Sequence, residues 1–195
     1  MIPKALYLAS QAVHATGEAP DVSFVPPLVR RRLSPLQKIY FSLAHRIGGK
    51  PHSAVFASRY GEDSLTRRLV EDFHADGTVS PNRFSASVYN AAPGLWSVHT
   101  GNTAPYTAVA AGDDTIECGL LEAVCAEAPS LFVYAEETSG GYGAAMSLSS
   151  DGQGRKISVS PGVPSRPPIA FESLVDFLEG ATSVLEGRWI ALNGD

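Results

Sequence analysis

The residues of this sequence that are best placed to do chemistry are Asp113 and Asp114, in the turn Ala111-Gly112-Asp113-Asp114. This turn follows a predicted strand at Tyr106–Ala110 and opens a predicted helix at Asp113–Ala126. A helix N-terminus stabilises negative charge, so a carboxylate there can act as a cap. Adjacent carboxylates could also bind a metal, but no histidine or third acid is spaced to complete the ligand set. A helix cap is therefore the favoured interpretation, with a metal site as the alternative.

The other candidate residues give weaker signals. The histidines have no ligand-like spacing: His14, His45, His52, His74 and His99. Of these, His99 stands out because it lies on a predicted helix rich in small residues, where a core or interface position is favoured over acid–base chemistry. Cys118 and Cys125 lie two helical turns apart, about 10 Å, which is too far for a disulfide, so both are expected to be core thiols. No G-x-S-x-G elbow or P-loop is present.

The composition excludes several classes of protein. The chain has 195 residues, 44% of them hydrophobic, and a net charge of -5, which fits one globular domain. Its one basic run, Arg30-Arg31-Arg32, is interpreted as a solvated helix start, so nucleic acid is not expected as a partner. No stretch of about 18 apolar residues or signal peptide is found, and the protein is expected to be cytoplasmic.

Strand and helix patterns alternate along the chain, which predicts an α/β fold with a mixed sheet. Strands are expected at Ala5–Ser10, Ser53–Ser58, Tyr106–Ala110, Ser130–Ala135, Tyr142–Ser149, Lys156–Ser160 and Trp189–Leu192. Helices are expected at Pro35–Ile47, Asp63–Phe73, Ser80–Thr100, Asp113–Ala126 and Phe171–Leu185. Pro93-Gly94 should kink the third of these helices. The proline-rich stretch Pro161–Pro168 is expected to be a loop.

The central segment resembles β-ketoacyl synthases of the thiolase-like fold. The resemblance rests on Ser80-Pro81 and on five later positions in order: Asn90, Gly94, Gly101, Ala104 (in place of a family glycine) and Pro105. It covers roughly residues 1–150 and is closest to the short chain-length-factor-like proteins of bacterial aryl polyene pigment clusters. It implies a single domain over residues 1–195, a thiolase-like half-fold whose mixed five-stranded sheet carries helices on its faces. Residues 151–195 depart from the family pattern.

Two departures from the family bear on function. The family's nucleophilic cysteine falls on Asp113, and a carboxylate cannot be acylated as a thiol is. The family's decarboxylation histidines lie in the second half of the fold, beyond the length of this chain. The resemblance therefore implies a non-catalytic subunit without a cofactor or metal. Its partner would be a full-length β-ketoacyl synthase, and it would meet an acyl carrier protein through that complex.

The resemblance also implies which residues meet the partner. In the family, the strand before the nucleophile turn pairs across the dimer axis, which corresponds here to Tyr106, Thr107, Ala108, Val109 and Ala110. The start of the small-residue helix projects into the partner's pocket, which corresponds to Arg83, Phe84, Ser87 and Tyr89. Control of the acyl tunnel and plain interface packing are equally open roles for the second set.

Three alternatives stay open. The chain could be a stand-alone enzyme with a small-molecule site near Asp113, Asp114 and His99. It could instead be a purely structural stabiliser of a ketosynthase. Pairing with a second copy of this chain is the alternative to pairing with a ketosynthase.

Overall fold

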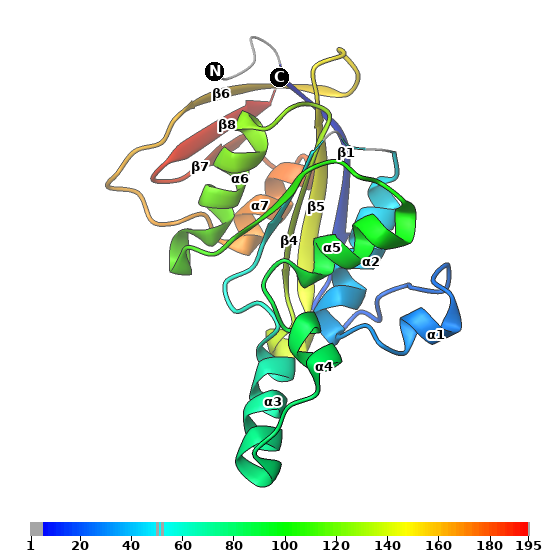
Figure 1. Ribbon diagram of the computed structural model, residues 1–195. Helices are drawn as coiled ribbons and strands as arrows, with labels where there is room; N and C mark the ends of the chain where they lie inside the picture. The colour runs from blue at the N-terminus through cyan, green and yellow to red at the C-terminus, as the bar shows by residue number, and fades with distance from the viewer. Residues whose placement is uncertain (1–5, 50, 52, 195) are drawn as a thin grey trace.

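A computed structural model describes residues 6–49, 51 and 53–194 of the chain. Eight strands form one sheet in the order β3-β2-β4-β5-β1-β6-β8-β7 (Figure 1). Their bounds are β1 Leu6–His14, β2 Ser53–Ala57, β3 Tyr106–Val109, β4 Ser130–Glu136, β5 Tyr142–Ser149, β6 Arg155–Pro161, β7 Val184–Glu186 and β8 Ile190–Gly194. Ala5, the first residue of a predicted strand, and His52 lie outside the described residues.

The strand directions confirm the predicted α/β class and mixed sheet. Strand β2 pairs in parallel with both β3 and β4, whereas β5 is antiparallel to both β4 and β1. Strands β1 to β4 therefore run in one direction and β5 in the other. The prediction of five strands is wrong in number. The C-terminal region continues the sheet beyond β1 with β6, β8 and β7, each antiparallel to its neighbour.

Helices cover both faces of this sheet. Their bounds are α1 Pro27–Arg30, α2 Pro35–Ile47, α3 Asp63–Asp76, α4 Pro81–Ala86, α5 Ala91–Thr100, α6 Thr115–Cys125 and α7 Phe171–Glu179. Figure 1 shows α2 and α5 on one side of the sheet, α6 and α7 on the other, and α3 projecting away from it. Among the described residues, no helix combines the length and the apolar character needed to cross a bilayer.

The sheet separates two hydrophobic cores. Tyr40 and Phe41 of α2 pack against one face, and Leu120 of α6 and Phe177 of α7 pack against the other. Every residue of β4 is buried, so this strand lies at the centre of both cores. Gly119 is needed for the close approach of α6 to the sheet, because a Cβ there would lie 2.7 Å from the Cβ of Ala57.

The segment predicted as one kinked helix at Ser80–Thr100 forms two helices, so that prediction is wrong. Helix α4 ends at Ala86, and α5 begins at Ala91 after a turn. Pro93 lies in the first turn of α5, where a backbone N–H has no partner within the helix. The proline is therefore tolerated without a kink, and the chain breaks before it.

The helix predicted at Phe171–Leu185 is too long. Helix α7 ends at Glu179, because Gly180 adopts the left-handed conformation (φ 79°) that commonly terminates a helix. Val184–Glu186 then forms β7. The assignment of both cysteines to the core is also corrected, because Cys118 is only half-buried and Cys125, the last residue of α6, is exposed.

Candidate functional site

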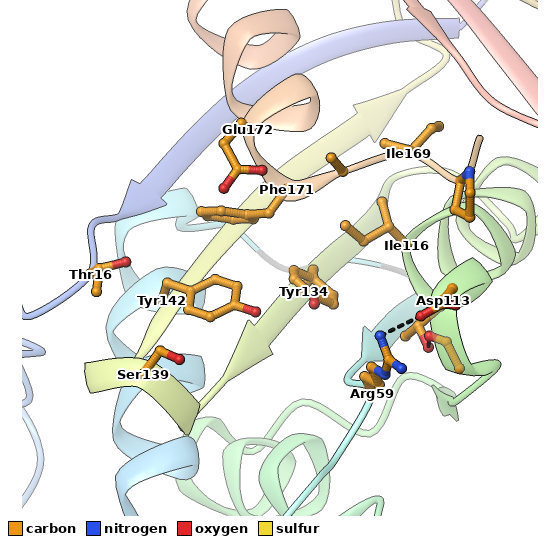
Figure 2. Close-up of a pocket in the computed structure, with 14 residues that line it drawn as sticks. Thr16, Arg59, Asp113, Ile116, Tyr134, Ser139, Tyr142, Ile169, Phe171 and Glu172 are labelled. Carbon is orange, nitrogen blue, oxygen red and sulfur yellow. Dashed lines mark hydrogen bonds and ion pairs between the residues drawn. The ribbon is translucent and has the colours of Figure 1, made fainter. Parts of the chain in front are cut away.

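A cleft of about 570 Å³ lies at the carboxyl ends of strands β1 to β4, which run in the same direction (Figure 2). Thr16 follows β1, Arg59 follows β2, Asp113 follows β3 and Ser139 follows β4, and all four line the cleft. Loops after the carboxyl ends of parallel strands converge at one edge, and ligands of open α/β sheets commonly bind there. The topology therefore brings together four loops that are far apart in the sequence.

Three aromatic rings form one surface of the cleft. Tyr134 of β4, Tyr142 of β5 and Phe171 of α7 have ring centroids between 4.8 and 6.3 Å apart. Burial raises the pKa of Tyr134, so its phenol stays protonated at neutral pH. Figure 2 shows Glu172 beside Phe171 and Ile116 beside Ile169 on the same cleft. These side chains offer apolar contact and hydroxyl groups.

Asp113 lies at the rim of the cleft and forms an ion pair with Arg59 (Figure 2). The Asp113 side chain is 67% exposed and that of Arg59 is 43% exposed. An ion pair in this much solvent contributes at most about 1 kcal/mol to stability. The carboxylate of Asp113 is therefore exposed to solvent and paired with a guanidinium group.

The hydroxyl of Thr115, rather than an aspartate, holds the turn before α6. It accepts a hydrogen bond from the backbone N–H of Ala111 (3.0 Å) and donates one to the carbonyl of Gly112 (2.7 Å). Asp114 occupies the N-cap position without a side-chain capping bond, and its nearest charged partner is Arg188, 3.5 Å away. The interpretation of the carboxylates as helix caps is therefore corrected by the structure.

A buried carboxylate fixes the loop that carries Arg59. Glu136, at the end of β4, is fully buried and accepts hydrogen bonds from the Ser58 hydroxyl (3.0 Å) and from the backbone N–H groups of Arg59 and Tyr60. Desolvation raises the pKa of Glu136, although these donors oppose the shift. One side of the cleft is thereby tied to the central strand.

A second buried carboxylate holds the opposite wall. Glu117, in the first turn of α6, is fully buried and accepts hydrogen bonds from the backbone N–H groups of Ile169 (3.0 Å) and Trp189 (2.8 Å). Gly187 packs so closely against it that a Cβ there would lie 2.3 Å from the Glu117 carboxyl carbon. The C-terminal segment, for which the sequence suggested no role, therefore covers α6 and supplies the cleft wall from Pro168 to Glu172.

The expected partner-facing residues occupy a different part of the molecule, on α4 and β3. Phe84 is exposed on α4, and Arg83 beside it forms an ion pair with Asp72 of α3 (2.8 Å). Ser87 follows α4, and its hydroxyl donates to the carbonyl of Phe84 (2.8 Å). Tyr89 is placed differently, because its hydroxyl donates to the backbone carbonyl of the chain's own Ser58. Burial raises the pKa of Tyr89 to about 12.

Strand β3 is one edge of the sheet formed by the described residues. The carbonyl of Pro105 accepts a hydrogen bond from Ala54 of β2, and that of Val109 accepts one from Ser58, directly after β2. Backbone polar groups alternate in direction along a strand, so those of Tyr106 and Ala108 face the free edge. Side chains alternate in the same way, with Ala108 packed against the α2 core and Val109 against the α6 core. The strand is therefore able to pair with another chain.

Exposed apolar side chains extend from β3 through α5 to α4. Helix α4 contacts α5, and α5 contacts β3. The exposed apolar residues on these elements and on the turn after α4 are Phe84, Val88, Leu95, Val98 and Tyr106. We refer to these five residues as the α5–β3 surface. A Cβ on Gly94 would lie 3.0 Å from the Tyr106 hydroxyl, and Val98 is one turn further along the same side of α5.

The stand-alone site suggested near Asp113, Asp114 and His99 is not assembled. The His99 ring packs among the rings of Phe24, Phe41 and Trp96, at centroid distances of 5.7 to 6.0 Å, on the α2 face of the sheet. The turn carrying both aspartates precedes α6, on the opposite face. Within the described part of the chain, no group of three or more His, Cys, Asp or Glu side chains could hold a metal ion.

A family model places this half-fold among known proteins. The model for the β-ketoacyl synthase N-terminal domain matches residues 7–147, which is most of the chain. The chain belongs to this family. The matched residues include the turn at Asp113 that lies at the rim of the cleft in Figure 2. None of the curated proteins matches the sequence.

Two solved structures share the fold. One is a complex of the ketosynthase ApeO with its chain length factor ApeC from Xenorhabdus doucetiae, where the match has a TM-score of 0.73 and 19% identity and covers 99% of this chain and 100% of that chain. The other is the ishigamide ketosynthase/chain length factor, with a TM-score of 0.57 and 12% identity over 75% of this chain and 54% of that chain. The ketosynthase family fold thus occurs both at the length of this chain and in a chain about twice the length of the matched part.

Proposed function

We propose that this chain is a non-catalytic, chain-length-factor-like subunit. It pairs in the cytoplasm with a full-length β-ketoacyl synthase and helps to shape that enzyme's acyl tunnel, in polyene, polyketide or fatty-acid-like chain elongation. An acyl carrier protein would deliver acyl groups to the complex. The proposal goes beyond membership of the family, because it assigns this member a partner and no reaction of its own.

The free edge of β3 beside the α5–β3 surface is the observation that supports the proposal most strongly. Backbone groups of Tyr106 and Ala108 point to that edge, and the five exposed apolar side chains extend from Tyr106 through α5 to α4. An exposed strand edge with adjoining apolar area favours association with another sheet. In the family this strand pairs across the dimer axis, so the same edge is the expected contact with a ketosynthase.

The residues of the nucleophile turn support the non-catalytic part of the proposal. The carboxylate of Asp113 is exposed and paired with Arg59, and the nearest thiol on α6, that of Cys118, has its pKa raised, chiefly by burial. A raised thiol pKa lowers the fraction of reactive thiolate. The matched chain in the ApeO–ApeC complex is covered from end to end by this half-fold, which agrees with a subunit of this length acting beside a ketosynthase.

Asp113→Asn should leave product formation by the complex within about twofold of wild type. The variant removes an exposed ion pair that contributes at most about 1 kcal/mol. Turnover of the reconstituted complex is the measurement, with Arg59→Gln as the matched variant that breaks the same pair from its other side. A loss of tenfold or more with Asp113→Asn alone would reveal a chemical role for this carboxylate.

Ser87→Phe should shorten the products of the complex by at least one elongation step. Ser87 is half-buried at the end of α4, and a phenyl ring there would reduce the space available to a growing chain. Each methylene that no longer fits costs about 1–3 kcal/mol, which is enough to stop elongation earlier. Product length would be measured by mass spectrometry on the reconstituted complex.

Ser85→Phe is the control for this experiment. Ser85 lies on α4, two residues before Ser87, but is exposed, and its hydroxyl donates to the carbonyl of Pro81 (2.9 Å). Products of unchanged length from an intact Ser87→Phe complex would contradict a role in the tunnel. If Ser87→Phe changed only the yield of the complex, the purely structural role would be favoured instead.

A further inference from the structure

A second cavity, distinct from the cleft at Asp113, lies between the start of α2 and helices α3 and α4. Its volume is about 700 Å³, within the range of small-molecule sites. Four arginines from three separate segments line it: Arg31, Arg32, Arg68 and Arg83. We refer to this cavity as the arginine groove. The chain has only 15 lysines and arginines and a net charge of -5, so this is a marked local concentration of positive charge.

Most of this positive charge is not neutralised by the protein. Arg83 is paired with Asp72, but the guanidinium groups of Arg31, Arg32 and Arg68 have no ion pair or hydrogen bond to the residues that the structure describes. The neighbouring acid on α3, Asp63, is occupied by Arg67 (2.8 Å), which does not line the groove. Three solvated guanidinium groups around one cavity favour an oxyanion.

The groove also has apolar walls. Leu33 is buried, Leu65 is half-buried and Leu95 is 37% exposed, and all three line the cavity with Pro35 and Ala86. A purely hydrated anion would gain nothing from this apolar area. An anion joined to an apolar segment would place its head among the arginines and remove the exposed parts of Leu65 and Leu95 from water.

The walls of the groove are held in place by one buried amide. Gln37 of α2 is fully buried, and its Nε2 donates to the Glu62 carboxylate before α3 (2.8 Å) and to the carbonyl of Ala86 in α4 (3.0 Å). Its Oε1 accepts from the backbone N–H of Ser34, which completes a capping box. The three helices around the cavity are thereby joined before any ligand arrives, which lowers the entropic cost of binding.

We infer that the arginine groove binds an amphiphilic oxyanion, in which a carboxylate or phosphate head is attached to an apolar chain. The head would be bound by Arg31, Arg32 and Arg68, and the chain would lie along Leu33, Leu65 and Leu95. This inference does not rest on the proposed function. Arg83 and Leu95 also belong to the proposed contact with a ketosynthase, so the inference is made for the chain without that partner.

The test is isothermal titration calorimetry of the full chain, without a ketosynthase, with decanoate and decyl phosphate below their micelle concentrations. One molecule of at least one anion should bind per chain, at least tenfold more tightly than decanol, which lacks the charge, or inorganic phosphate, which lacks the tail. Tighter binding of decyl phosphate would identify a phosphate ester as the natural head group. Tighter or equal binding of decanoate would identify a carboxylate.

The matched variants are Arg68→Gln and Arg46→Gln, each of which removes one exposed positive charge. Arg68 lines the groove, whereas Arg46 lies in the last turn of α2, away from the groove at the start of that helix, so both variants should unfold near the wild-type temperature. We expect Arg68→Gln to weaken binding at least tenfold and Arg46→Gln to change it less than twofold. Equal losses in the two variants, equal binding of decanol, or no binding of either anion would overturn the inference.

Discussion

Val98→Asp is expected to weaken the complex with a ketosynthase by about 100-fold in Kd, while leaving this chain folded. Val98 is the most exposed apolar side chain of the α5–β3 surface, at 82%, so the substitution has little to disturb in the free chain. In the complex the aspartate would be removed from water without a partner. A 100-fold change corresponds to about 2.7 kcal/mol, a modest value for an unpaired buried charge.

The control for this prediction is Val70→Asp. Val70 is also an exposed apolar residue on a helix, at 51%, but it lies on α3, outside the α5–β3 surface. Both variants should have the wild-type circular dichroism spectrum and melting temperature, and Kd would be measured by surface plasmon resonance. Wild-type affinity of Val98→Asp would place the interface elsewhere, and an equal loss for Val70→Asp would mean that charge alone weakens association.

Glu117→Gln is expected to destabilise the chain by about 2–4 kcal/mol. The carboxylate accepts two backbone hydrogen bonds, from Ile169 and Trp189, in a site with no solvent exposure. The amide of glutamine can accept only through its single oxygen, so its NH₂ would face one of the two buried N–H groups. Loss of a buried hydrogen bond together with an unsatisfied buried donor accounts for this magnitude.

Urea denaturation would measure this effect, and limited proteolysis would locate it. Cleavage in the Glu117→Gln variant should begin within residues 162–189, because that segment loses its attachment to α6. Glu122→Gln is the matched control, since Glu122 lies on the same helix but is exposed. A Glu117→Gln variant within 0.5 kcal/mol of wild type would show that other contacts hold the C-terminal segment.

Elements with local signals could be predicted from the sequence. Ser34-Pro35 predicts the start of α2, and the structure has a complete capping box there with Gln37. The class of fold and the turn at Asp113 could be predicted for the same reason, because a short strand and the start of a helix flank that turn directly. The break between α4 and α5 was missed, since a small-residue segment is compatible with one long helix.

The composition of the cleft depends on long-range contacts and could not be predicted. Arg59 could have been suspected, because it directly follows a buried strand parallel to the one before Asp113. Phe171 and Glu172 could not, because their place in the cleft depends on contacts with residues far away in the sequence. Phe171 packs against Tyr134 and Tyr142. Glu117 holds the same segment through hydrogen bonds from Ile169 and Trp189. The arginine groove likewise joins segments whose proximity depends on the buried amide of Gln37.

Co-expression with a full-length ketosynthase would show most directly whether this chain is the partner subunit of such an enzyme. Size-exclusion chromatography with light scattering would give the mass of the purified species. We expect a stable one-to-one complex that Val98→Asp disrupts and Val70→Asp does not. A chain that elutes apart from the ketosynthase, as a monomer or as a dimer of itself, would contradict this role.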